Sequence, residues 1–342
     1  MEVDNFMKKT KLLLLAALLV SGSLVSCGGA KEKTYKAGLG QAISITRNDA
    51  NIITQIDITF ASVVFDSDKI VSTYVDVVQL PIVYTPAEGE TAESYAYKAT
   101  ANQIKKAGDK NVETKKELKE RYGMTGIGAG EWNVQADAFE DWAEGKKLSE
   151  LVVTEGAADD DHSHAWTNNI TGCTILVGDF VKAIKNAANH SVEFKAKEAP
   201  KAGVGVIVGT AGKQLEITFA SAATTGDVVN ASVVDVYQIA LKNGDLDAAN
   251  KGVVYKLDGT DFASKFELKE HYGMTGIGAG EWNVQAEAFQ KWTMGKKVAD
   301  LVVTEGAADD THSHAWTNNV TGCTILAGDF VSAIKEAATN RR

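Results

Sequence analysis

The sequence predicts an α+β fold made of two tandem homologous domains, each an antiparallel sheet with packed helices. The main observation is a repeat. Tyr122–Ala136 is identical to Tyr272–Ala286, and His162–Leu176 returns with one change as His312–Leu326, both at a spacing of 150 residues. This period exceeds the roughly 20–50 residues of solenoid repeats and therefore indicates two domains. Strand-like and helix-like segments lack the regular order of βαβ units, which favours the α+β class.

Each copy begins with a predicted β-hairpin. Two segments of strand-like alternation, Ile56–Phe65 and Lys69–Val78, are joined by a short polar turn. Leu215–Ala223 and Val228–Gln238 repeat this pattern in the second copy, and both pairs read as antiparallel hairpins. The first copy then carries a nine-residue insertion near Thr85–Ser94. A surface loop tolerates such an insertion, so we expect it outside the core.

Two helices are predicted after the hairpin. Thr114 and Glu117 have the spacing of a capping box, and Gly123 ends the short helix that they begin. A longer helix over Glu131–Glu144 stops at Gly145, and the second copy carries the same signals. The expected core stripe of the longer helix consists of Trp132, Ala136, Phe139 and Ala143.

A strand and a last helix complete each copy. In the first copy the strand is expected over Trp166–Leu176, and the helix runs from Asp179, its expected N-cap, to Ala188. These elements set the domain boundaries. The predicted parts are a first domain over residues 37–188, a polar linker over residues 189–201 and a second domain over residues 202–340.

The N-terminus has the pattern of an exported lipoprotein. Lysines precede the apolar run Leu12–Val20, and Leu24–Cys27 then forms a lipobox. The run is too short to remain as a membrane-spanning helix. We therefore expect a signal peptide over residues 1–26, lipid attached to Cys27, and a tether over residues 27–36. The chain would be anchored at the extracytoplasmic face of the cell membrane.

Composition limits the classes of partner and chemistry. The formal net charge is −10, which disfavours nucleic acid and anionic lipid headgroups. With Cys27 lipidated, Cys173 and Cys323 remain, one in each copy, so no disulfide can form within a domain. No nucleophile, base and oxyanion site converge in the sequence, so no catalytic residues are predicted.

A short motif points to a cofactor. Thr171–Thr174 and Thr321–Thr324 both read TGCT and resemble the flavinylation motif of the FMN-binding domain family, D-G-x-[S/T]-G-A-T. In that family the last threonine is joined to FMN through a phosphodiester. The whole chain resembles the extracellular-electron-transfer flavoprotein lipoproteins of Gram-positive bacteria. The resemblance implies that Thr174 and Thr324 accept two covalent FMN groups per chain.

The resemblance also implies partners and a role. An exported, magnesium-dependent ApbE-type flavin transferase would attach FMN, with FAD as donor. Electrons would then pass from a membrane donor, a quinone-linked dehydrogenase system, to extracellular acceptors. The protein would be an electron carrier rather than an enzyme with its own substrate.

The motif departs from the family pattern in the same way in both copies. Asn168 and Asn169 stand where the pattern has aspartate and glycine, and Cys173 stands for alanine. Cysteine for alanine is a small change at an apolar position. Asparagine for aspartate removes a charge that the transferase could recognise.

Nearby residues could hold the flavin. Trp166 is a candidate for stacking on the ring, with packing as the alternative, whereas Trp132 and Trp142 suit the core. The loop Gly126–Gly130 could direct N–H groups at a phosphate, or could be a tight turn that needs positive φ. The predicted cofactor-binding residues are Thr174, Thr324, Trp166, Trp316, Gly172, Gly322, Gly128 and Gly278.

Two other functions remain open at this point. Each copy has an acidic H-x-H group, which could bind zinc or copper in a metal-binding lipoprotein. The residues concerned are His162, His164, His312 and His314. Duplication and surface location also suit a repeated adhesion or ligand-binding module.

Overall fold

The computed structural model describes residues 31–50, 52–85, 88, 94–97, 112–158, 165–211, 214–240, 263–308 and 314–342. Contacts divide the chain into an N-terminal unit, Met1–Glu32, and a compact unit, Lys33–Arg342, which contains both copies of the repeat.

The first copy builds a five-stranded antiparallel sheet with the order β4-β3-β2-β1-β7. The predicted hairpin is confirmed as β2 and β3, which pair from Gln55↔Pro81 to Asp66↔Lys69. The strands are β1 (Lys33–Arg47), β2 (Ile53–Asp66), β3 (Lys69–Thr85), β4 (Ser94–Tyr97) and β7 (Ser191–Ala196).

The second copy builds a three-stranded antiparallel sheet with the order β10-β9-β8. The strands are β8 (Lys201–Ala211), β9 (Gln214–Thr225) and β10 (Val228–Ala240), and the predicted hairpin is confirmed as β9 and β10. The predicted linker segment, residues 189–201, contains β7, which pairs with β1 along Lys33–Gly38.

Sequence patterns did not predict the first strand of either sheet. β1 and β8 contain glycines, which sequence analysis associates with loops. A Cβ on Gly38 or Gly40 would overlap the backbone of the helix packed on β1, and Gly203 and Gly205 stand in the same relation to the helix on β8. These glycines therefore mark close approach of a helix to a strand rather than a turn.

The helices confirm most of the predicted signals. Both capping boxes are present, at Thr114 with Glu117 and at Ser264 with Glu267, and Gly123 ends the first short helical segment with φ +86°. The helices are α2 (Lys115–Leu118), α3 (Trp132–Ala143), α4 (Gly178–Asn189), α5 (Lys265–Leu268), α6 (Trp282–Thr293) and α7 (Gly328–Asn340). Short 3-10 segments are η1 (Lys119–Tyr122), η2 (Leu148–Glu150), η3 (Lys269–Tyr272) and η4 (Val298–Asp300).

Two local predictions were wrong. The strand expected over Trp166–Leu176 is limited to β6 (Trp166–Thr167), which pairs with β5 (Glu155–Gly156), because the chain turns at Gly172 with φ +80°. Their counterparts are β11 (Glu305–Gly306) and β12 (Trp316–Thr317). Asp179 is not the N-cap of α4 but lies in its first turn. There its negative charge interacts favourably with the positive end of the helix dipole.

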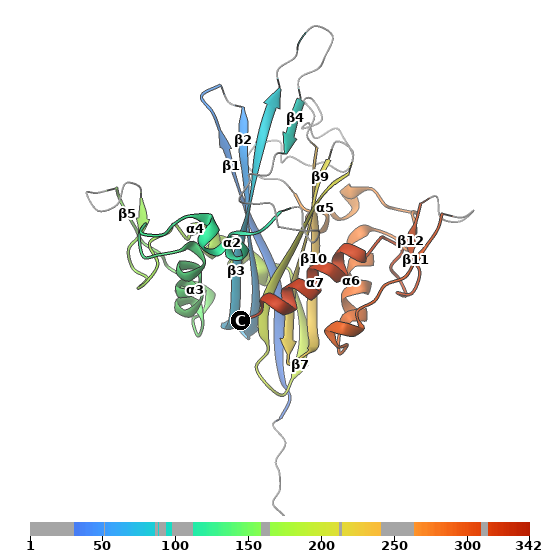
Figure 1. Ribbon diagram of the computed structural model, residues 1–342. Coiled ribbons are helices and arrows are strands. Elements are labelled where there is room, and N and C mark those ends of the chain that lie inside the picture. The colour runs from blue at the N-terminus through green and yellow to red at the C-terminus, as the bar shows by residue number, and fades with distance from the viewer. Residues whose placement is uncertain are drawn as a thin grey trace, which may run out of the picture. The chain divides into compact units, whose positions relative to one another are not determined.

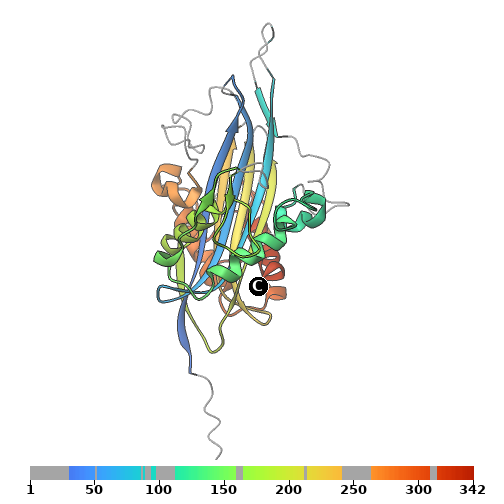
Figure 2. The same cartoon turned by 90° about the vertical axis from the view of Figure 1, so that its left-hand side faces the viewer.

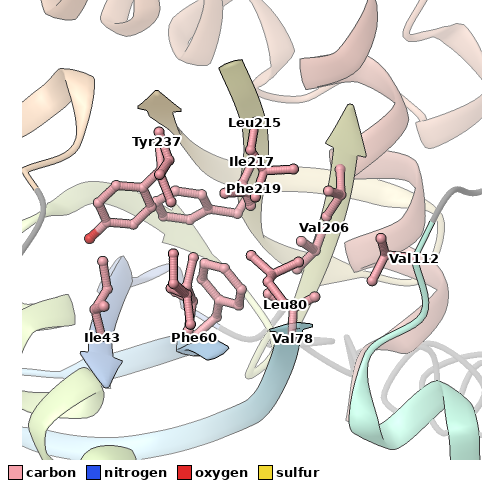
Figure 3. Close-up of a cluster of buried hydrophobic side chains, with 14 of the residues drawn as sticks. Ile43, Phe60, Val78, Leu80, Val112, Val206, Leu215, Ile217, Phe219 and Tyr237 are labelled. Atoms are coloured by element: carbon pink, nitrogen blue, oxygen red, sulfur yellow. The ribbon is translucent and has the colours of Figure 1, made fainter. Parts of the chain in front are cut away.

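The two sheets pack face to face and share one core. Buried side chains of β1–β3 and of β8–β10 form a single cluster, in which the Phe60 and Phe219 ring centroids lie 4.7 Å apart (Figure 3). Separate clusters bury α3 and α4 against the outer face of the first sheet and α6 and α7 against that of the second. The layers are therefore helices, sheet, sheet, helices, as Figure 1 and the turned view in Figure 2 show.

This arrangement confirms a mixed fold with antiparallel sheets and packed helices. Each sheet is covered by its own helices on one face and by the other copy on the opposite face. A single copy would expose the inner face of its sheet, so burial of that face depends on its partner. The predicted domain boundaries stay a prediction.

Ion pairs also join the copies at the C-terminal end of α7. Arg342 Nη1 lies 3.2 Å from Glu140 Oε2 of the first copy, and Lys116 Nζ, also of the first copy, lies 2.6 Å from Glu140 Oε1. Arg342 also pairs with Asp141, and its backbone N–H donates to Ala202 O at 3.0 Å. Glu140 is fully buried, so its charge needs these cations.

Replacing Arg342 by alanine is expected to lower the free energy of unfolding by about 1–3 kcal/mol, because a buried carboxylate loses one of its two cations. Urea unfolding measures this. Arg341→Ala is the matched control, since Arg341 Nη1 donates a 3.5 Å hydrogen bond to Thr224 Oγ1 and forms no ion pair with the residues that the structure describes. Equal losses for the two variants would contradict the assigned role of Arg342.

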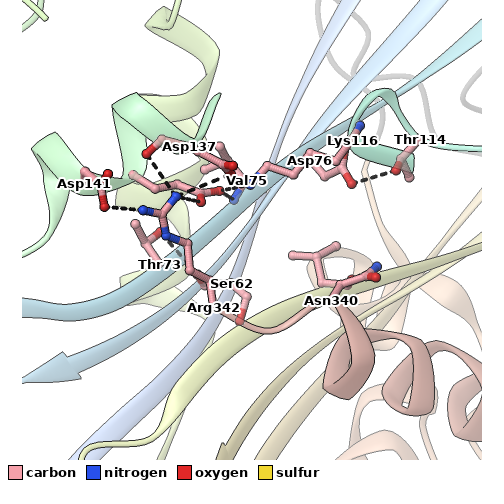
Figure 4. Close-up of polar contacts among 12 residues, drawn as sticks. Ser62, Thr73, Val75, Asp76, Thr114, Lys116, Asp137, Asp141, Asn340 and Arg342 are labelled. Atoms are coloured by element: carbon pink, nitrogen blue, oxygen red, sulfur yellow. Dashed lines mark hydrogen bonds and ion pairs between the residues drawn. The ribbon is translucent and has the colours of Figure 1, made fainter. Parts of the chain in front are cut away.

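A buried aspartate sits at corresponding places in the two sheets. Asp76 accepts hydrogen bonds from Thr114 Oγ1 at 2.6 Å and Lys116 N at 3.0 Å, so it fixes the start of α2 (Figure 4). Asp235 accepts from Phe266 N at 3.0 Å and does the same for α5. Burial raises the pKa of Asp76 to about 6 and that of Asp235 to about 7.

The raised pKa of Asp76 predicts a pH dependence of stability. The folded chain holds a proton that the unfolded chain releases above about pH 4, so stability falls as the pH rises through the pKa of about 6. Relative to Asp76→Asn, the unchanged protein should lose at most about 1.4 kcal/mol per pH unit in this window. Urea unfolding at several pH values tests this, and a difference that does not vary with pH would contradict it.

Candidate functional site

The two motif threonines occupy the same environment in the two copies. Thr174 is half-buried and follows a turn in which Cys173 N donates to Ile170 O at 3.1 Å. Its Oγ1 accepts a hydrogen bond from Ala129 N at 3.1 Å and donates to Gln135 Oε1 at 2.9 Å. The motif thus lies against the loop that precedes α3, and this contact joins segments that are 45 residues apart in sequence.

One glutamine on α3 holds this arrangement together. Gln135 Oε1 also accepts the N–H groups of Thr174 at 2.7 Å and Ile175 at 3.2 Å, while its Nε2 donates to Gly130 O at 2.6 Å. Gln285 makes the same bonds in the second copy, each within 0.1 Å of these lengths. Sequence analysis missed this residue, although a glutamine within the identical EWNVQA stretches was an available signal.

The glycine loop brings backbone directly onto the threonine hydroxyl. Gly126, Gly128 and Gly130 have φ values of +77°, +58° and +126°, so the prediction of a tight turn with positive φ is confirmed. A Cβ on Gly128 would overlap Thr174 Oγ1. Only glycine therefore permits this approach. Binding of a phosphate by the loop stays a prediction.

The tryptophans separate into two groups. Trp132 is 4% exposed and packs edge-on against Phe180 with centroids 5.7 Å apart, and Trp142 packs against the same core, which confirms their predicted role. Trp166 is half-buried on β6, next to Thr167, whose N–H donates to Thr174 O at 3.1 Å. Its indole lies close against Gly156. Stacking of Trp166 on a flavin is not tested by this geometry.

Three exposed aliphatic residues lie close in sequence to Thr174 or to the residues around its hydroxyl. Ile127 directly precedes Gly128, Val134 directly precedes Gln135, and Leu176 follows Thr174 by two residues. Their exposed fractions are 56% for Ile127, 53% for Val134 and 50% for Leu176, against 57% for Ile277, 52% for Val284 and 50% for Leu326.

The asparagines that depart from the family pattern have structural partners. Asn169 Oδ1 accepts from Thr154 N at 3.0 Å, and its Nδ2 donates to Val152 O at 3.0 Å. Asn168 Oδ1 accepts from the Thr154 hydroxyl. Because an aspartate or a glycine at position 169 would lack the Nδ2 donor, the departure maintains this loop pairing.

The cysteines lie in the core beside the motif. Cys173 and Cys323 are both free and 1% exposed. Burial raises the pKa of the Cys173 thiol to about 12 and that of Cys323 to about 11. Both thiols are therefore protonated near neutral pH and are poor metal ligands and nucleophiles.

The metal-site prediction falls mostly outside the described residues. His162, His164 and His312 lie there, as does the predicted lipidation site Cys27, whereas His314 is exposed. Within the described ranges, no group of three histidine, cysteine, aspartate or glutamate side chains could hold a metal ion. None of the described helices is long and apolar enough to cross a membrane.

Comparisons with protein-family models, curated proteins and solved structures give no match to this chain. The site is therefore interpreted from its own geometry and from the motif resemblance.

Two glycine variants test the close approach to Thr174. Gly126→Ala adds a methyl group with nothing within 4 Å, so it carries only the cost of positive φ, about 1–2 kcal/mol. Gly128→Ala adds the same backbone cost and an overlap with Thr174 Oγ1, which should destabilise by about 1–3 kcal/mol more. Urea unfolding of both variants measures the difference, and equal losses would contradict this packing.

Proposed function

We propose that this chain is a membrane-anchored, extracytoplasmic electron carrier with FMN attached covalently to Thr174 and Thr324. The observation that supports the proposal most is the pair of matching hydroxyl environments. In each copy the motif threonine is only half-buried, receives a backbone N–H and is followed two residues later by an exposed leucine. A modification site needs an accessible hydroxyl, and a flavin ring needs apolar surface.

The residues around Thr174 fit a phosphodiester at Oγ1. Gly128 has no Cβ to overlap the hydroxyl oxygen, and Ala129 N–H already points at this oxygen. Esterification would remove the hydroxyl proton and therefore one of the bonds to Gln135. The two backbone N–H bonds to Gln135 Oε1 would remain and keep the chain in position on both sides of the attachment point.

Apolar contact for the ring would come from the exposed side chains Ile127, Val134 and Leu176, with Trp166 as the aromatic candidate. The bound flavin would supply one- and two-electron redox chemistry. The protein would contribute attachment, exclusion of water from one ring face and local charge. The remaining parts of the proposal are an ApbE-type transferase, a quinone-linked membrane donor, extracellular acceptors and a lipid anchor at Cys27.

Co-expression with the transferase tests attachment. Intact mass and the visible spectrum should show two FMN adducts per chain, one in Thr174→Ala or Thr324→Ala, and none in the double variant. Thr339→Ala is the matched control because it changes an exposed threonine on α7, outside the motif, and should keep both adducts. A full complement of adducts on the double variant would overturn the assignment.

The near-identity of the two environments predicts similar redox potentials. The hydrogen bonds around Thr174 and Thr324 agree within 0.1 Å, so the local dipoles at the two attachment points match. Redox titration of the two single-threonine variants, each with one flavin, should give overlapping midpoints. A separation well above about 100 mV, roughly 2.3 kcal/mol per electron, would show that the copies differ in role.

A further inference from the structure

The interface between the two copies, which we call the seam, includes two corresponding positions. Each position lies just past the last helix of one copy. At the first position, Arg342 follows α7 and reaches α3 of the first copy at Glu140. At the second position, His190 follows α4 and stacks on Phe266 of the second copy, with ring centroids 3.4 Å apart and an interplanar angle of 11°. The contents of the two positions differ.

The first position is filled by charged side chains. Arg342 Nη1 lies 3.2 Å from Glu140 and 3.3 Å from Asp137, and its other nitrogen pairs with Asp141. Lys116 contacts the same carboxylates, at 2.6 Å from Glu140 and 2.8 Å from Asp137. The chain itself therefore satisfies the polar groups at this position.

The second position contains space instead. Two cavities of about 290 and 270 Å³ share Asn189, His190 and Phe266 as lining residues. Gln41 lines the larger cavity, and Gln290 lines the smaller one. Their volumes lie near the lower end of the roughly 300–1,000 Å³ that is typical of small-molecule sites.

Several residues that line these cavities carry buried polar atoms. His190 and Gln41 are each 8% exposed and Gln290 is 2% exposed. Neither ring nitrogen of His190, nor Gln41 Oε1, nor Gln290 Nε2 has a hydrogen-bond partner among the residues that the structure describes. The Nδ1 atom of His190 lies 4.0 Å from Asp235 Oδ2, which is beyond hydrogen-bond distance. Buried polar groups in folded proteins are almost always hydrogen-bonded, so a cluster of them around shared space indicates a missing partner.

The differences between the copies indicate which ligand fits. Gln290 and Lys291 stand where the first copy has Glu140 and Asp141, so the carboxylates that bind a guanidinium are replaced. The charged residues that line the two cavities are Lys182, Lys291, Glu267 and Glu287, two of each sign. This balance favours a neutral ligand over an anion or a cation.

A ligand that pairs with the unpartnered atoms of Gln41, His190 and Gln290 must supply both hydrogen-bond donors and acceptors. Gln290 Nε2 donates and Gln41 Oε1 accepts, while a neutral imidazole offers one of each. Burial lowers the pKa of His190 to about 3, which keeps it neutral. Hydroxyl groups can pair with all of these, because each donates and accepts. Phe266 and Tyr237 supply apolar wall for a carbon skeleton.

From this geometry we propose that the seam between His190, Gln41, Gln290 and Phe266 is a binding site for a small, neutral, polyhydroxylated compound of monosaccharide size. The proposal does not depend on the flavin proposal, since the residues differ from those around Thr174 and Thr324.

Isothermal titration calorimetry of the full chain tests the site. Glucose, galactose, N-acetylglucosamine, myo-inositol and glycerol serve as neutral probes, gluconate as the anionic probe and arginine as the cationic one. At least one neutral probe should bind with one site per chain and a Kd of about 1 mM or below. No saturable binding at about ten times that concentration, or preference for gluconate or arginine, would overturn the proposal.

Variants locate the binding. His190→Ala and, separately, Gln290→Leu should each weaken it at least about tenfold, which corresponds to a loss of one or more hydrogen bonds. Asp141→Lys is the matched control, because it introduces at the first position the lysine that the second copy has as Lys291. This change lies outside the cavities and should leave the affinity unchanged. Circular dichroism confirms folding of each variant. Unchanged affinity in both folded seam variants would overturn the assignment.

Discussion

The structure depends on burial of the inner faces of two sheets against each other. Within the part of the chain that the structure describes, helices pack on the outer faces, and Phe60 and Phe219 meet in the core between the inner faces. Apolar burial on this scale dominates folding energetics. The outer faces are then free to carry helices, and those helices hold the candidate sites. The duplicated sequence is thus used to complete one core rather than merely to repeat a function.

The same arrangement explains why the threonine sites match and the seam positions do not. Gln135 and Gln285 each hold a motif within one copy, from α3 or α6, and their surroundings are nearly identical in sequence. Seam residues instead contact the other copy, so each position combines different partners. Arg342 fills one position, whereas the stacked His190 and Phe266 border a cavity at the other. Duplication therefore preserved the local sites and allowed the contacts between copies to diverge.

Local signals predicted local structure well. The hairpins, the capping boxes and the stripe of α3 all follow from periodicity and turn residues within short windows. The strand β1 was missed because Gly38 and Gly40 respond to a helix that packs on them from elsewhere in the chain. Contacts of Gln135 with Thr174 and of Arg342 with Glu140 could not be predicted, since they depend on tertiary packing.

Both copies fold as one unit through their shared core. Hydrogen exchange of Phe219→Ala measures this directly, because the change removes a ring of the second copy and should cost about 3–5 kcal/mol. The account predicts faster exchange in β2 and α3 of the first copy as well as in β9 and α6 of the second. Loss of protection confined to the second copy, with the first copy unchanged, would contradict it.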